Sequence, residues 1–582
     1  MLKPMFHKCD VLVIGGGFSG AWSALSAAEH AKSVLIVDKG SRDWRGLGMM
    51  SGGDMGVVPC ECSVDDFLEE LVYYYDGLCD QPFARMVLEQ SYARFSDLER
   101  WGHKFARNPD GSMRYILQRD LKLIRYYYYH PYGKGGPHTC DTLYDQLEQR
   151  GARRLSNVQI VDLIKEDGDS GRVTGAVGFH TRSGMPVVIQ AGAVILCTNT
   201  GGFKMSYLGN TAVGEGAVLG FRAGAEFRSM EFLQNWTCPR AFAWEGQTGM
   251  LPYGARFVNS EGRDFMREYS PIHGAKSDPH YNIRGMALEA REGRAPLWFD
   301  TSTMSPEGVE AMTPTGGWML LNDQKLKALG IDFFKSRTEW MPQFQYIFGG
   351  MVTDLQCRTR VPGLYAAGRA ASLHTGVYMG GWDTCMTSTT GYVAGAAAAK
   401  EAMNLDRSVP FDKGQALERL APALDLMERP GIAPKDIVRA VQELMVPADV
   451  SVLKTGQGLS RSLQKLEYVR DNLLPEMAAA DPHYLLKAME ARGMTLVAEM
   501  YLRASLMRKE SRCGHFREDY PTRDGDPAWI HIDRHNGRMR LRFHRVPVET
   551  YQFRPHRYYM DDFNYPDQPK SVPSGTMEAS HA

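Results

Sequence analysis

The segment that most constrains the fold is GGGFSG, which follows the apolar run CDVLVI near the start of the chain. Gly15, Gly17 and Gly20 have the G-x-G-x-x-G spacing, and a helix of small residues is expected directly after them. Without Cβ atoms the backbone of this turn can approach a pyrophosphate, whose charge then faces the helix N-terminus. The next apolar run, SVLIVDKG, predicts a second strand ending at Asp38, whose carboxylate can accept hydrogen bonds from a ribose diol. Together these features predict a dinucleotide-binding βαβ unit.

Two further glycine-rich segments favour FAD over NAD as the dinucleotide. GLGMMSGGDMG, residues 46–56, follows Asp38 at a distance where a loop can run past an isoalloxazine ring, although a flexible surface loop is the alternative. GLYAAGRAA, far downstream, is a second glycine-rich segment of the kind that closes over a flavin. A nicotinamide-binding domain would not need this second segment. The residues expected to bind FAD are Gly15, Gly17, Phe18, Ser19, Gly20, Asp38, Lys39, Gly46, Ser51, Gly52, Gly53, Gly368, Arg369, Asp383 and Thr384.

The length of 582 residues exceeds what one hydrophobic core usually serves, so several domains are expected. The pattern predicts an α/β fold, in which a Rossmann-like FAD-binding domain is interrupted by an inserted α+β capping domain. A helical domain and an irregular tail then follow. The expected boundaries are 1–234 and 342–405 for the FAD-binding domain, 235–341 for the capping domain, 406–512 for the helical domain and 513–582 for the tail.

Composition excludes several classes of protein and of site. The 67 basic and 68 acidic residues nearly cancel, and the basic residues of the tail alternate with acids and aromatics, which disfavours nucleic-acid binding. The ten cysteines include no CxxC pair, so reduced thiols are expected, with no metal site and no iron–sulfur ligand set. No apolar run reaches the roughly 20 residues of a membrane-spanning helix, and no secretory signal is recognisable at the start. A cytoplasmic protein without membrane insertion is therefore expected.

The order of these segments resembles the flavoprotein subunits of the succinate dehydrogenase and fumarate reductase family, which includes L-aspartate oxidase and the adenylylsulfate reductase flavoprotein (its α subunit). The matching stretches are DVLVIGGGFSG, GFRAGAEFRSMEF, VPGLYAAGRAA and SRCGHFREDYPTRDGDPAWIHI. The layout looks closest to adenylylsulfate reductase. The resemblance implies a split FAD domain, a mobile capping domain and hydride transfer at flavin N5. It also implies a small-molecule substrate and electron exchange with a separate iron–sulfur, ferredoxin-like protein.

The chain departs from the family at the positions that carry its chemistry. The family's His after the MEF motif falls on Trp236, its second His on Gln345, and its carboxylate-binding Arg on Tyr378. Its proton-shuttling Arg falls at or beside Pro279. These losses imply a substrate unlike fumarate, because a dicarboxylate needs guanidinium partners. An aromatic pocket would instead favour a flat or apolar substrate, with ordinary packing under the flavin as the alternative. Its expected members are Tyr378, Trp382, Trp236 and Tyr346.

Two further departures concern the flavin itself. The family's covalent flavin linkage uses a His in a loop where this chain has none between Asp38 and Gly56, so noncovalent FAD is expected. Arg369 replaces a Glu that most relatives place near the ribityl chain, which either alters the flavin contacts or points to solvent.

Proton transfer beside the flavin needs a group of matched pKa within hydrogen-bond reach. Tyr378 and His374 lie in the glycine-rich stretch expected beside the ring, while His280 and Arg284 lie on the capping side. The catalytic candidates are Tyr378, His374, His280, Arg284, Trp236 and Gln345.

Three functions remain open at this point. The first is an FAD oxidoreductase with altered specificity that exchanges electrons with a ferredoxin-like partner. The second is an oxidase that reoxidises its flavin with oxygen, and the third is a noncatalytic flavoprotein subunit. The sequence leaves the substrate and the oligomeric state open.

Overall fold

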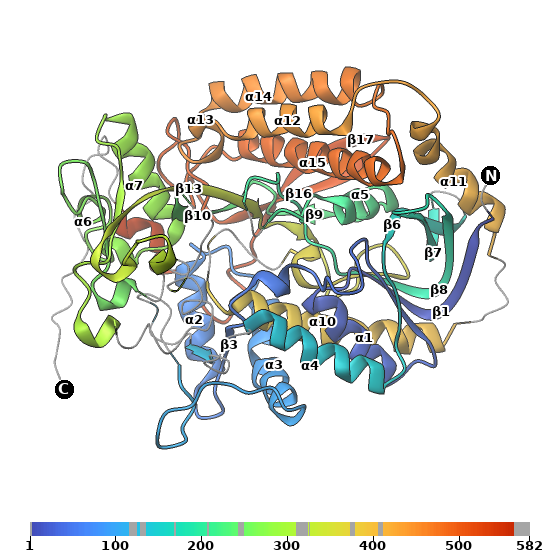
Figure 1. Cartoon of the computed structure of the whole chain (residues 1–582), viewed down its shortest axis with the longest axis horizontal. Coiled ribbons are helices and arrows are strands. Elements are labelled where there is room, and N and C mark those ends of the chain that lie inside the picture. Colours follow the sequence, from blue (N-terminus) through green and yellow to red (C-terminus); the bar gives the residue numbers. More distant parts are fainter. Residues whose placement is uncertain are drawn as a thin grey trace.

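The computed structural model has a sheet-centred body, a lobe on one side of it and a layer of helices above (Figure 1). The residues that the structure describes are 3–115, 121, 125–127, 135–167, 170–206, 209–241, 250–309, 324, 326–372, 377, 379–405 and 411–563.

The main sheet has seven strands in the order β5-β2-β1-β8-β7-β6, with β15 also paired to β8. They are β1 (Met5–Ile14), β2 (Val34–Val37), β5 (Arg153–Leu155), β6 (Val158–Asp167), β7 (Ser170–His180), β8 (Pro186–Leu196) and β15 (Leu364–Ala366). The pairs β5-β2, β2-β1, β1-β8 and β8-β15 are parallel, and β6 and β7 extend the sheet in antiparallel fashion. All of β2 and the second half of β1 are buried, as expected for parallel strands covered on both faces.

Helices α1 (Phe18–Ala28) and α10 (Trp382–Met403) pack against each other beside this sheet. Their contact is close because a Cβ atom on Gly391 or Gly395 of α10 would collide with the backbone of Ser19 or Ser23. The same side of the sheet carries three further helices (Figure 1). They are α2 (Val64–Tyr74), α3 (Gln81–Arg100) and α4 (Gly135–Gln149). A short antiparallel pair joins β3 (Met55–Val57) to β4 (Arg125–Tyr127).

A second, four-stranded antiparallel sheet forms the lobe at the left of Figure 1. Its order is β10-β13-β12-β11, with β10 (Leu233–Pro239), β11 (Arg256–Val258), β12 (Trp298–Asp300) and β13 (Arg337–Ile347). Helices α6 (Met266–Tyr269) and α7 (Pro279–Arg291) belong to the same lobe, and α7 packs on β10 and β13. This lobe occupies the stretch predicted to be the capping domain, although β10 begins and β13 ends slightly outside it.

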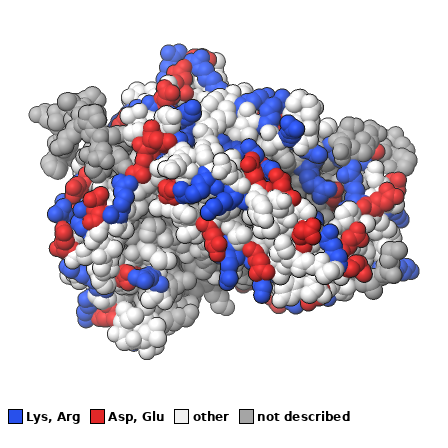
Figure 2. All heavy atoms as spheres, turned by 90° about the horizontal axis from the view of Figure 1, so that it is seen from above, with Lys and Arg blue, Asp and Glu red and all other residues white. Residues whose placement is uncertain are grey.

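The segment predicted to be helical contains α11 (Lys413–Leu424), α12 (Pro434–Met445), α13 (Ala448–Ser451), α14 (Gly456–Tyr468) and α15 (Pro482–Met507). Helix α15 packs on α5 (Glu215–Ala223), which connects this layer to the main body. Positive and negative side chains alternate over the face seen from above (Figure 2). No helix in the described ranges is long and apolar enough to cross a membrane.

The tail differs from the irregular segment expected of it, because it contains a β-hairpin of β16 (Ala528–His535) and β17 (Arg538–Arg545). The hairpin joins β9 (Phe227–Arg228) and β14 (Gly350–Met351) in the order β14-β9-β16-β17. Asn536 and Gly537 form its turn, both with positive φ, 50° and 77°. Asn-Gly is the strongest short-range signal for a hairpin, so the sequence itself contained the information needed to predict this hairpin.

Candidate flavin and substrate site

The glycine turn has the backbone that a pyrophosphate site requires. Gly15 adopts φ +108°, which side chains rarely permit, and a Cβ on Gly20 would collide with the Gly15 carbonyl oxygen. Gly17 is the N-cap of α1 and offers no side chain to the first-turn N–H groups. These donors fit the phosphates of a dinucleotide, because the turn can approach them and α1 begins here.

Asp38 ties the end of β2 to this turn. Its carboxylate accepts hydrogen bonds from the backbone N–H groups of Gly16 and Gly40. Lys39, by contrast, donates its ammonium protons to Glu215, Glu490 and the carbonyl oxygen of Thr211. The Lys39 side chain therefore joins the main body to the helical layer.

The loop predicted to pass the flavin ring is packed against the glycine turn. A Cβ on Gly46 would lie 2.7 Å from the Cα of Gly17, and one on Gly48 would lie 2.6 Å from the Phe18 ring. Ser51 is half-buried and donates its hydroxyl proton to the Gly48 carbonyl oxygen, and Gly52 and Gly53 follow it directly. The loop thus packs on the glycine turn, which favours its predicted place beside the cofactor over the alternative of a flexible surface loop.

The downstream segment returns to the same place. A Cβ on Gly368 would lie 2.6 Å from that of Ser19, whose hydroxyl is 3.4 Å from the Ala367 carbonyl oxygen. Asp383 and Thr384 lie in the first turn of α10, after the N-cap Gly381. Three segments far apart in sequence, around residues 15–20, 46–48 and 368, therefore meet at the start of α1.

Arg369 connects this region to the capping sheet. Its guanidinium forms an ion pair with Asp383 and donates to the Gln234 side-chain oxygen and the Tyr346 hydroxyl, each at 2.9 Å. The Arg369 Cζ lies 3.8 Å from the centroid of the Tyr346 ring. Gln234 belongs to β10 and Tyr346 to β13. The alternative in which Arg369 points to solvent is therefore wrong, because its side chain is only 10% exposed.

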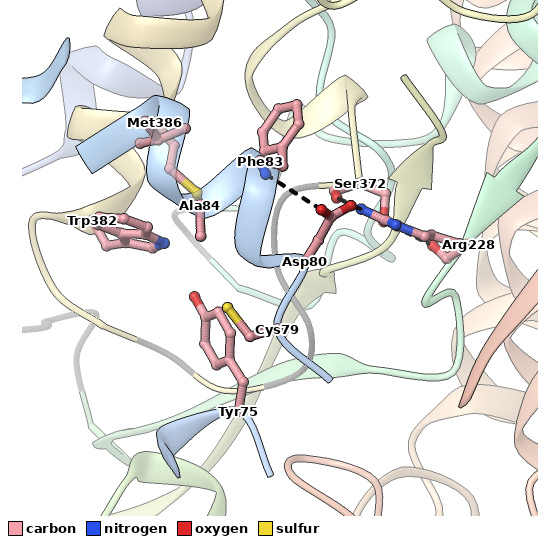
Figure 3. Close-up of a pocket in the computed structure, with 10 residues that line it drawn as sticks. Tyr75, Cys79, Asp80, Phe83, Ala84, Arg228, Ser372, Trp382 and Met386 are labelled. Carbon is pink, nitrogen blue, oxygen red and sulfur yellow. Dashed lines mark hydrogen bonds and ion pairs between the residues drawn. The ribbon is translucent and has the colours of Figure 1, made fainter. Parts of the chain in front are cut away.

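The expected aromatic pocket is only partly assembled by the described residues. Tyr346 contacts Arg369, and Trp236 is buried in β10 opposite Gln343. Trp382 instead lines a separate small cavity with Tyr75, where the Tyr75 hydroxyl points toward the indole (Figure 3). This cavity measures about 10 Å³, roughly what one water molecule needs, so it is too small for a substrate.

The cavity has a polar end. Arg228 forms an ion pair with Asp80 at 2.8 Å and donates to the Ser372 carbonyl and hydroxyl oxygens (Figure 3). The Arg228 guanidinium also lies over the Trp529 ring of the tail hairpin, with Cζ 4.5 Å from the ring centroid.

The two capping-side candidates both have partners within the protein. The His280 Nδ1 faces the Asp278 carboxylate, and its Nε2 lies 2.8 Å from the Leu233 carbonyl oxygen. Arg284 is 1% exposed and donates to the Cys513 carbonyl oxygen. Burial lowers the pKa of Arg284, which remains a cation stacked on neighbouring rings, among them that of Tyr281.

Tyr378 and His374 lie outside the described residues, as does the side chain of Gln345, so their roles stay predictions. No group of three or more His, Cys, Asp or Glu residues in the described ranges is placed to hold a metal ion.

Two residues near the site were not singled out from the sequence. Gln234 carries no distinctive pattern, and only folding places it against Arg369. Asp54 stands directly after Gly53, and burial raises its pKa to about 7. The sequence could have drawn attention to Asp54, because it is the one carboxylate in the glycine cluster 46–56.

Comparisons with known proteins agree with this geometry. Residues 10–382 match the family of FAD binding domains, and residues 439–559 match the C-terminal domain of fumarate reductase flavoproteins. The chain is 28% identical over 555 residues to one of the subunits of the CoM/CoB fumarate reductase of Methanothermobacter marburgensis, covering 91% of this chain and 97% of that protein.

Two solved structures share the fold. A variant of Escherichia coli quinol fumarate reductase superposes with a TM-score of 0.82 at 22% identity, covering 94% of this chain and 98% of the other. Adenylylsulfate reductase from Archaeoglobus fulgidus gives a TM-score of 0.79 at 20% identity, covering 95% and 98%. The FAD-binding match alone spans more than half of the chain. The chain therefore belongs to the FAD-binding flavoprotein family of the fumarate reductases and succinate dehydrogenases, and it is an FAD-dependent oxidoreductase.

Proposed function

We propose that the protein transfers hydride between flavin N5 and a small substrate that is not a dicarboxylate, and that it exchanges electrons with a separate iron–sulfur, ferredoxin-like protein. The glycine turn 15–20 would hold the pyrophosphate of a noncovalently bound FAD, and Asp38 its ribose. The loop 46–53 and the start of α10 would hold the ring. FAD supplies the hydride chemistry, and the chain supplies binding, orientation and electrostatics.

The observation that carries this proposal is the pairing of Arg369 with Asp383. Binding a dicarboxylate removes water from its two charges, at a cost in free energy. Only cations that are not already paired can offset this cost, and guanidinium groups in bidentate contact do so best. Arg369 lies between the cofactor-binding segments and the capping sheet, where a substrate carboxylate would need it. Its charge is already balanced by Asp383, so this part of the site favours an uncharged substrate.

Two other buried arginines in the region support the same conclusion. Arg284 donates to a backbone carbonyl and stacks on aromatic rings, and Arg228 is paired with Asp80. Recruiting either one for a substrate would break contacts that compensate a buried charge, at a cost of several kcal/mol.

The electron partner is proposed from the relatives. The relative from Methanothermobacter marburgensis is named as a subunit of a fumarate reductase. The relative from Escherichia coli is named as a fumarate reductase flavoprotein subunit. Both names describe one component of a larger enzyme.

The test is a reoxidation experiment. The flavin of the purified protein is reduced with dithionite under argon, and its visible absorption is followed after addition of fumarate, sulfite with AMP, oxygen or an oxidised ferredoxin. Reoxidation by ferredoxin, with fumarate ineffective, is expected. Fast reoxidation by fumarate would overturn the substrate proposal. Fast reoxidation by oxygen alone would favour an oxidase, and no reoxidation by any of them would favour a noncatalytic subunit.

A pair of variants tests the charge argument itself. Asp383→Asn releases Arg369 and is expected to strengthen perturbation of the flavin spectrum by fumarate. The matched control is Arg369→Gln combined with Asp383→Asn, which removes both charges and is expected to show no such gain. Equal fumarate responses in the two variants would contradict the proposed role of the ion pair.

A further inference from the structure

Asp54 lies where two parts of the cofactor-binding surface meet. On its N-terminal side, a Cβ on Gly53 would lie 2.7 Å from the carbonyl carbon of Gly135, at the start of α4. On its C-terminal side, the Gly56 N–H donates to the Gly381 carbonyl oxygen, at the start of α10, at 2.8 Å. The short segment that carries Asp54 is therefore held between two helix N-termini and continues the loop that packs on the glycine turn.

The carboxyl group of Asp54 is poorly compensated. Its Oδ1 is buried and has no hydrogen-bond partner in the described part of the chain, while the residue as a whole is half-buried. Burial alone raises the pKa of Asp54 to about 7. A carboxyl group in this state is close to half protonated at neutral pH, which is the condition for efficient proton exchange.

Several charged groups on the surrounding elements form ion pairs with other residues, and none of them contributes to the pKa shift of Asp54. The elements packed against β3 are α3, α10 and β4, and α4 begins beside Gly53. For β4 the structure describes the backbone. Ion pairs of these three helices include Arg94 with Asp97 on α3, Arg369 with Asp383 of α10, and Arg45 with Asp141 of α4. No charged neighbour in the described ranges accounts for the shift at Asp54, so its proton affinity follows from its burial.

We propose that Asp54 holds the proton that FAD takes up when it is reduced by electrons arriving without hydride. This inference rests on the proposed function, because iron–sulfur proteins deliver electrons singly and bring no proton. Two such electrons and one proton are needed to form reduced flavin. The O–H bond of Asp54 would break as an N–H bond forms at N5, and a hydronium ion from solvent would then return a proton to the carboxylate and leave water. Asp54 thereby couples proton uptake to electron delivery.

The first experiment is a spectroscopic titration of the holoenzyme in its oxidised state. Ionisation of a carboxyl group beside the ring shifts the visible absorption of the flavin, so a single step centred near pH 7 is expected for the natural protein. Asp54→Asn is isosteric and cannot ionise, so this step should be absent. The control is Asp43→Asn, which removes an exposed carboxylate from the same connection and should leave the step in place. A natural protein without a step overturns the inference, whatever the variants do.

The second experiment measures the rate at which reduced methyl viologen, a one-electron donor, reduces the bound flavin. The rate for the natural protein should fall about tenfold from pH 6 to pH 8, following the protonated fraction of Asp54. Asp54→Asn should be slow and nearly independent of pH over this range, and Asp54→Glu should restore part of the dependence. A natural pH profile in Asp54→Asn, at equal FAD content, would overturn the inference.

The two proposals fail in different ways. Rapid reoxidation of the reduced flavin by fumarate would overturn the substrate proposal without affecting the titration of Asp54. An unchanged spectrum across the titration would overturn the role of Asp54 while leaving the choice of substrate and electron partner untouched.

Discussion

Arg369 and Asp383 form an ion pair between the turn after β15 and the first turn of α10, and the Arg369 guanidinium stacks on Tyr346 of the capping sheet. These contacts join the second part of the FAD-binding domain to the lobe that is predicted to close over the substrate. In our proposal, this charge-balanced group lies where a carboxylate substrate would need a free cation.

Removing either member of this pair should destabilise the protein. Arg369→Gln leaves Asp383 without its cation, and a cost of about 1–3 kcal/mol is expected, less than for a fully buried pair because Asp383 is 26% exposed. Denaturant unfolding of the apoprotein measures this. Arg369→Gln combined with Asp383→Asn should cost less than the two single changes added together. Additive costs would show that the pair contributes no coupling.

The glycine turn offers a way to separate folding from cofactor binding. Gly20→Ala places a Cβ against the Gly15 carbonyl and should reduce both apoprotein stability and FAD content. The nearest atom to a Cβ on Gly17 is 3.9 Å away, in Gly46, and the φ of Gly17 is an ordinary −77°. Gly17→Ala should therefore leave the apoprotein within about 0.5 kcal/mol of the natural one yet weaken FAD binding at least tenfold. FAD titration and thermal unfolding of the apoproteins distinguish the two effects.

The ion pair between Lys39 and Glu490 of the helical layer should make the stability of the protein depend on pH in the acid range. Burial of Glu490 opposes its ionisation, but Lys39, Lys204 and Lys487 outweigh it and lower the pKa of Glu490 to about 2. A carboxylate with a lowered pKa contributes stability above its ordinary pKa, and this contribution disappears as the pH falls from about 4.5 toward 2.

Glu490→Gln should accordingly cost about 2–3 kcal/mol at neutral pH, and its stability should converge with that of the natural protein near pH 2. Denaturant unfolding at a series of pH values measures the convergence. Glu476→Gln, at an exposed position, serves as the control and should follow the natural curve throughout. A constant gap between Glu490→Gln and the natural protein would contradict this electrostatic account.

The tail hairpin should be an integral part of the fold. Trp529 is 4% exposed, donates its indole N–H to the Leu78 carbonyl at 3.0 Å and stacks under Arg228. Trp529→Ala should cost about 3–5 kcal/mol in unfolding free energy. Phe543, on the neighbouring strand, is 52% exposed, and Phe543→Ala should cost less than about 0.5 kcal/mol. Equal costs for the two variants would show that the hairpin is only loosely attached.

The prediction of FAD as cofactor was confirmed. It could be made from the sequence because dinucleotide binding depends on features that lie close together along the chain. A glycine turn between a buried strand and a helix, followed by a strand that ends in an acid, can be read from residues 9–38 alone. The fold class and the family were confirmed for a related reason, since the order of motifs along the chain records the topology. The assignment of individual catalytic residues stays a prediction, as Tyr378 and His374 lie outside the described residues.

The sequence by itself thus determined the cofactor, the fold class and the order of the parts, because short-range backbone geometry and periodicity encode them. Tertiary structure decided which residues of the candidate site contact one another. Gln234 on β10 and Tyr346 on β13 both contact Arg369, which follows β15, and no local pattern relates the three residues. The state of Asp54 was likewise invisible in the sequence, because the pKa of a carboxyl group depends on burial, and burial depends on what the rest of the chain packs around it.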